Sequence, residues 1–114
     1  PPRSTLFPYT TLFRSRLLQA THSAPRYRLY VLPDGKRPAM VRDEPKGDAI
    51  AVEVWEIPSA EVGSLLVAIP APLGLGQIEL ADGRWVTGFI CEAGGLGAAT
   101  EITAWGGWRQ WLAR

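Results

Sequence analysis

The sequence predicts an α+β fold: a small, mixed and mostly antiparallel β-sheet or barrel with one or two short helices. Three patterns predict it, namely alternating residues at 26–32, a hairpin signature at Asp82-Gly83 and helical apolar spacing over 60–68. The chain has 114 residues, 46% apolar and 20% charged, which suits one globular domain. The longest apolar run contains prolines and is too short to span a membrane, so we expect no membrane contact.

The first half of the chain is predicted to contain three strands. Residues 26–32 (RYRLYVL) alternate apolar and polar side chains, as a half-buried strand does. A turn follows at residues 33–35, where Gly35 can adopt a positive φ, and a second short strand is expected at 38–42. Residues 49–57 carry apolar side chains on both faces, which favours a central strand.

A short helix is predicted next. Ser59 is placed as the N-cap of a helix over residues 60–68, and Pro70 must end it. The following segment, residues 69–76 (IPAPLGLG), is rich in proline and glycine but has almost no polar side chains. We therefore expect a partly buried loop there.

The last third of the chain is predicted to form a hairpin and a short helix. Asp82-Gly83 is typical of a type I′ turn between strands at 77–81 and 84–92. Residues 108–113 carry apolar side chains on one side of a helical turn or two.

The N-terminus differs in composition from the rest. Residues 1–28 contain five arginines and no acidic residue, whereas acidic residues exceed basic ones in residues 29–114. Residues 5–15 (TLFPYTTLFRS) resemble the translation of a common sequencing-library adapter. We therefore predict that residues 1–15 are an adapter artefact with no structural role, and that the domain occupies residues 16–114.

Few residues are candidates for chemistry. His22 is the only histidine and Cys91 the only cysteine, so neither a catalytic triad nor a multi-histidine or cysteine metal site can be assembled. We expect His22 to be solvated and Cys91 to be a small buried apolar residue. The glycine motifs lack the third glycine or the lysine that phosphate-binding loops need. We expect no metal and no cofactor.

Two other groups of residues say more about function: the glutamates that lie in apolar strands, and the tryptophans. A half-buried Glu53, Glu79 or Glu92 could act as an acid or base, or could instead pair with an arginine. Three tryptophans lie close together near the C-terminus, at 105, 108 and 111. We expect a core or docking edge rather than base stacking, because the acidic balance of this half repels nucleic acid.

Four segments together resemble the C-terminal domain of allophanate hydrolase. They are SAPRYRLYVL at 23–32, IAVEVWEIP at 50–58, IPAPLGLGQIELADGRWVTGFICE at 69–92 and EITAWGGWRQWLA at 101–113. The resemblance covers most of residues 23–113 and implies a fold related to the γ-glutamyl-cyclotransferase-like mixed barrel. It also implies a place in urea degradation.

In that family the chemistry is divided between two domains. An amidase domain hydrolyses allophanate, and the C-terminal domain is thought to promote decarboxylation of the N-carboxyurea product. We find no amidase signature in these 114 residues, so an amidase domain normally in the same chain is the implied partner. His22 does not match the histidine of the family's opening strand, so we expect the parent protein to be active and this polypeptide to have little activity.

The resemblance also implies a site. Backbone N–H groups of the IPAPLG segment would hold a small carboxylated urea at the mouth of the barrel. Glu92 is the catalytic candidate, although it could equally be part of a stabilising pair. The predicted substrate-binding residues are Ile69, Pro70, Ala71, Pro72, Leu73, Gly74, Thr103 and Arg109.

Other functions remain open. A non-catalytic docking or dimerisation module would use Trp105, Trp108 and Trp111 as its partner surface, with a homodimer as one outcome. A free-standing cyclotransferase relative is disfavoured, because a glutamate of that superfamily is replaced within residues 68–70. The single cysteine favours the reducing cytoplasm.

Overall fold

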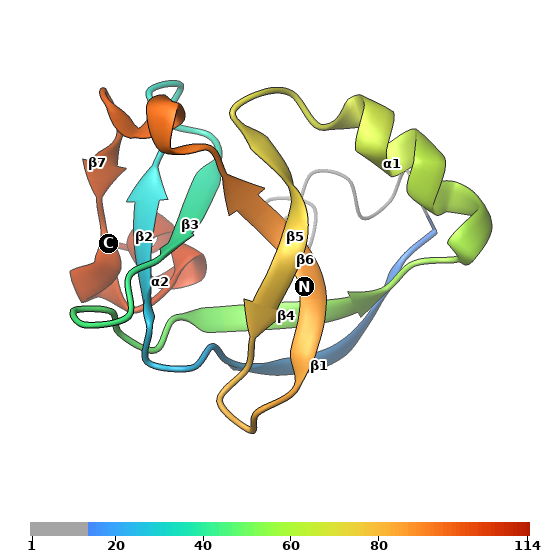
Figure 1. Ribbon diagram of the computed structural model, residues 1–114, viewed down its shortest axis with the longest axis horizontal. Coiled ribbons are helices and arrows are strands. Elements are labelled where there is room, and N and C mark those ends of the chain that lie inside the picture. The colour runs from blue at the N-terminus through green and yellow to red at the C-terminus, as the bar shows by residue number, and fades with distance from the viewer. Residues whose placement is uncertain (1–13) are drawn as a thin grey trace.

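The computed structural model describes residues 14–114 as three small antiparallel sheets around one apolar core (Figure 1). The strands are β1 (Arg16–His22), β2 (Tyr27–Val31), β3 (Pro38–Arg42), β4 (Ala51–Glu56), β5 (Leu73–Glu79), β6 (Trp85–Cys91) and β7 (Thr100–Glu101). The helices are α1 (Val62–Ala68) and α2 (Trp108–Leu112), with 3-10 turns at Ser59–Glu61, Ala93–Leu96 and Thr103–Trp105. The predicted adapter artefact, residues 1–15, lies almost entirely outside the described residues.

The three sheets are joined at their ends. β1 pairs with β4, β2 lies between β3 and β7, and β5 pairs with β6. An isolated bridge from Ser23 to Leu80 connects the ends of β1 and β5, and one from Ala51 to Gly107 connects β4 to the residue before α2. The strands of residues 14–114 do not close into a barrel, so the α+β prediction is confirmed in its open form.

β2 supplies the centre of the core, as its alternation predicts. Tyr27, Leu29 and Val31 are buried, whereas Arg28 and Tyr30 between them remain half-buried. Burial of side chains of this size stabilises the fold by about 1.5–3 kcal/mol each. The other buried members of the core come from all parts of the chain: Ile50, Ile78, Ile102 and Trp108.

The first sheet differs from the prediction in two ways. No strand was predicted at β1, because a bulge between Leu17 and Gln19 interrupts its pairing with β4 and hides the two-residue period. The prediction that β4 is central was wrong. Its only strand partner among residues 14–114 is β1, and most of its side chains are partly exposed.

The predicted helix is present but begins differently. Ser59 starts a 3-10 turn rather than capping an α-helix, and no side chain caps α1, which begins at Val62. Only Leu65 of α1 is buried. α1 and α2 lie at opposite ends of the molecule in Figure 1. No helix in residues 14–114 is long and apolar enough to cross a membrane.

The hairpin is present, but its turn was assigned to the wrong type. A type I′ turn needs a positive φ at both central residues, and of Asp82 and Gly83 only Gly83, at +92°, has one. Leu80 C=O accepts the Gly83 N–H at 3.0 Å, and the Leu80 N–H donates to Arg84 C=O at 2.8 Å. This is the three-residue loop in which a glycine with positive φ follows a type I turn.

β5 begins four residues earlier than predicted, inside the segment expected to be a loop. Gly76 pairs opposite Gly88 in the two-stranded ribbon. Because neither has a side chain, Ile90 can pack over Gly76 and Ile78 over Gly88. A Cβ on Gly76 would lie 2.7 Å from Ile90, and one on Gly88 2.8 Å from Ile78. Pairing with β6 therefore makes a strand from a sequence with low strand propensity.

Candidate functional site

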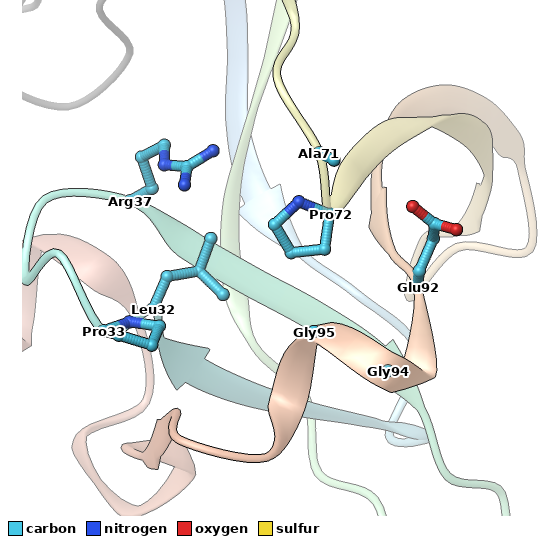
Figure 2. Close-up of a pocket in the computed structure, with 8 residues that line it drawn as sticks. All are labelled: Leu32, Pro33, Arg37, Ala71, Pro72, Glu92, Gly94 and Gly95. Carbon is cyan, nitrogen blue, oxygen red and sulfur yellow. The ribbon is translucent and has the colours of Figure 1, made fainter.

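One pocket of about 430 Å³ lies where the end of β2, the start of β5 and the end of β6 meet (Figure 2). Its size is within the range of small-molecule sites. It is lined by Leu32, Pro33, Arg37, Ala71, Pro72, Glu92, Gly94 and Gly95.

Backbone hydrogen bonds bring the two central segments of the pocket together. The Glu92 N–H donates to Pro72 C=O at 2.8 Å, which extends the β5–β6 pairing by one step. The Gly95 N–H donates to Glu92 C=O at 2.9 Å and so begins the 3-10 turn after β6. A Cβ on Gly95 would lie 2.3 Å from Pro72, so only glycine permits this close packing. The Ala71–Pro72 peptide bond is cis.

The pocket includes three of the residues predicted for the site. Ala71, Pro72 and Glu92 line it, and Glu92 is exposed at the end of β6. Five others do not line it: Ile69, Pro70, Leu73, Gly74 and Thr103. Arg109 also lies outside the lining. The binding roles of all of these residues stay predictions.

Thr103 and Arg109 are engaged in hydrogen bonds within the fold. The Thr103 hydroxyl is buried and accepts the Leu29 N–H at 2.9 Å. Arg109 Nε donates to Glu53 Oε2 at 2.8 Å, and the other oxygen of Glu53 accepts the indole N–H of Trp55 at 3.1 Å. Glu53 thus links β4 to α2, which is the pairing alternative that the sequence left open.

Arg37 is the one cationic residue of the lining, and sequence reasoning missed it. Its Nε donates to Asp34 Oδ2 at 2.8 Å, and Asp34 also accepts the Lys36 N–H at 2.9 Å. These interactions lower the pKa of the Asp34 carboxyl, the Lys36 N–H contributing most. The turn at residues 33–35 was predicted, but only the tertiary structure places Arg37, two residues later, beside Pro72.

Cys91 and His22 have limited roles in the geometry. Burial raises the pKa of the Cys91 thiol, and the charge of Glu92 raises it further while that of Arg37 opposes the shift. A raised pKa makes the reactive thiolate scarce at neutral pH. His22 is exposed at the end of β1 and does not line the pocket. Across residues 14–114 no three side chains of His, Cys, Asp or Glu gather as a metal site would require.

The C-terminal tryptophans divide between core and surface. Trp108 is buried in the core, and Trp111 stacks on it with ring centroids 5.0 Å apart. Trp105 is 47% exposed and is the only one of the three with a large free surface. The partner surface predicted for a docking module is therefore reduced to Trp105 and its surroundings.

These features define a small open-sheet α+β domain with one arginine- and glutamate-lined pocket. Comparison with protein-family models matches residues 9–113 to the allophanate hydrolase C-terminal domain. Because this match covers most of the chain, the protein belongs to the allophanate hydrolase C-terminal domain family.

Individual relatives agree with this assignment. Urea amidolyase of Saccharomyces cerevisiae is 34% identical over 101 residues, which cover 83% of this chain and 6% of the yeast protein. A crystallised Kluyveromyces lactis allophanate hydrolase matches with a TM-score of 0.86 and 30% identity, covering 91% of this chain and 18% of that one. The chain thus spans only a small part of these relatives.

A third similar structure is much shorter. A protein described as specific to uropathogenic E. coli matches with a TM-score of 0.86 and 32% identity. The match covers 94% of this chain and 84% of that protein. The same fold therefore occurs both as a small part of large enzymes and as most of a small protein.

Proposed function

We propose that this chain is the accessory domain of a urea-degrading amide hydrolase and acts in the cytoplasm on the carboxylated product of an amidase domain. The family match over residues 9–113 carries the proposal. It is supported by the pocket, in which part of the IPAPLG segment lies beside the candidate acid Glu92.

Balancing the atoms defines the substrate more closely. Allophanate is itself a urea that carries a carboxylate on one of its nitrogens, so the expectation that the amidase product is N-carboxyurea was wrong, because that compound is the amidase substrate. Hydrolysis of its terminal amide releases ammonia and leaves ⁻OOC–NH–COO⁻, a nitrogen with two carboxylates. Breaking one C–N bond then releases carbon dioxide, the electron pair returns to nitrogen, and one proton completes carbamate. The domain must therefore accept a small dianion and deliver a proton to its nitrogen.

Glu92 is proposed as the group that handles this proton. It is the only carboxyl group of the pocket lining, it is exposed, and none of the ion pairs of residues 14–114 includes it. A well-placed general acid accelerates a reaction by about 100- to 10,000-fold. Because no histidine lines the pocket, we expect this chain to accelerate the decarboxylation by less than about 100-fold.

In the test, the substrate is generated in the reaction mixture itself. An allophanate hydrolase amidase domain generates the dicarboxylated product from ¹³C-labelled allophanate, and NMR follows its decay with and without this chain. The chain should shorten the lifetime of the intermediate by less than roughly 100-fold, and Glu92→Gln should remove the effect. Glu56→Gln is the matched control, since Glu56 lies on β4 outside the pocket lining and forms only an exposed pair with Arg16.

Two results would contradict the proposal. An unchanged lifetime would remove the decarboxylation role. Acceleration well above 100-fold would show that the chain needs no histidine of the kind the family resemblance implies.

A further inference from the structure

Arg37 lines the pocket and has one donor without a hydrogen-bond partner. Its Nη1 is buried and has no hydrogen-bond partner, although a buried donor without a partner costs free energy. The side chain as a whole is 25% exposed. The guanidinium is therefore partly buried, at Nη1, and partly open at the pocket, and a ligand would contact its exposed part.

The guanidinium is also held in place. Asp34 fixes its Nε edge, and Asp34 is itself fixed by the Lys36 N–H in the turn after β2. The Arg37 backbone is tied to the same turn, because its C=O accepts the Leu32 N–H at 3.0 Å. A planar guanidinium with one edge fixed presents its remaining N–H groups in a constant direction, which suits recognition of a carboxylate.

The surroundings narrow the class of ligand. Leu32, Pro33 and Pro72 give the pocket apolar walls, so a charged group of the ligand gains little from them. In Figure 2, Arg37 and Glu92 lie on either side of Pro72. A ligand that contacts both residues needs a carboxylate for Arg37 and a hydrogen-bond donor for Glu92.

We propose that Arg37 binds a carboxylate of the ligand in this pocket, and that the ligand is a small acid whose carboxylate lies next to an N–H group. The inference rests on the proposed function, because ⁻OOC–NH–COO⁻ is such an acid. In that arrangement Arg37 holds one carboxylate and leaves the nitrogen toward Glu92. Arg37 is then the residue that positions the substrate.

Direct binding of a stable mimic tests this inference separately from any reaction. Malonate replaces the N–H of the product by a methylene group and cannot decompose in the same way. In a titration at constant salt, followed by ¹H–¹⁵N NMR, malonate should saturate the protein and shift the amides of Gly94 and Gly95. Arg37→Gln should lower the affinity for malonate at least about tenfold, the loss expected when a charge-assisted hydrogen bond is removed.

The adjacent residue offers a matched control. Lys36→Gln removes the same charge one position away, at a side chain that does not line the pocket, and keeps the backbone N–H that holds Asp34. It should leave malonate affinity within about twofold, since an exposed charge has little effect at a distance. Arg37→Lys keeps the charge but loses the planar fork, and should bind malonate with intermediate affinity. Amide spectra of each variant verify that it is folded.

The outcomes separate the inference from the proposed function. The role of Arg37 is refuted if Arg37→Gln lowers the affinity for malonate no more than Lys36→Gln does, or if the wild-type chain does not bind malonate. If binding depends on Arg37 while the chain leaves the decay of the dicarboxylated intermediate unchanged, the carboxylate site stands and the decarboxylation proposal fails.

Discussion

Replacing Thr103 with valine tests whether this predicted substrate-binding residue is instead part of the framework. Thr103 is only 7% exposed, and its hydroxyl accepts the Leu29 N–H at 2.9 Å. Valine has the same shape but cannot accept a hydrogen bond, so the Leu29 amide loses this acceptor inside the core. Leaving a buried donor unsatisfied costs about 1–3 kcal/mol.

The effect should be seen in both stability and local exchange. A loss of about 1–3 kcal/mol lowers the Tm of a domain of this size by roughly 4–8 °C per kcal/mol. Urea denaturation gives the free energy of unfolding, and hydrogen exchange should show weaker protection of the Leu29 amide in particular. Malonate affinity should be unchanged when measured well below the Tm of the variant.

Thr87→Val is the matched control, because the Thr87 hydroxyl makes only an exposed hydrogen bond with Gln77. Thr87→Val should change the free energy of unfolding by no more than about 0.5 kcal/mol. If Thr103→Val is as stable as Thr87→Val, the argument from the buried hydrogen bond is wrong. If it remains stable but no longer binds malonate, Thr103 contributes to the site as the sequence predicted.

Further predictions concern the core, the pocket and acid pH. Ser23→Ala should destabilise the protein by about 1–3 kcal/mol in urea denaturation, because the fully buried hydroxyl accepts the Ile50 N–H at 2.9 Å; a near-neutral effect would contradict this. Gly95→Val should abolish malonate binding, because a Cβ would lie 2.3 Å from Pro72; retained affinity in a folded variant would show that this packing is unnecessary. The lowered pKa of Asp34 means that the unfolded chain binds the proton more readily, so Asp34 stabilises the fold above about pH 4 and loses this effect as the pH falls through its folded-state pKa. In Asp34→Asn, the urea concentration at the unfolding midpoint should therefore fall less on acidification than in the wild-type protein. An equal fall in both would refute the stabilising role of the Asp34 carboxylate.

Local patterns were sufficient for much of the fold. The alternation at 26–32 identified β2 and its buried face, since side chains two residues apart must lie on the same side of a strand. Gly35 was predicted to take a positive φ and does so at +71°. These features depend on neighbours within a few residues, which the sequence displays directly.

Elements that depend on distant partners were missed or misplaced. β1 is interrupted by a bulge, and β7 has only two residues, so neither produces a readable period. The start of β5 is decided by its register against β6. Propensity gave no signal there because the pairing itself stabilises the strand.

The sequence by itself determined the family and the α+β class, and it pointed to the IPAPLG segment and Glu92. Only the tertiary structure decided which residues share a pocket: it brought Arg37 beside Pro72 and held Thr103 and Arg109 in hydrogen bonds of the fold. The reason is that secondary structure and motif identity are local properties of the chain. A binding site consists of contacts between segments far apart in sequence, and these exist only once the sheets have packed.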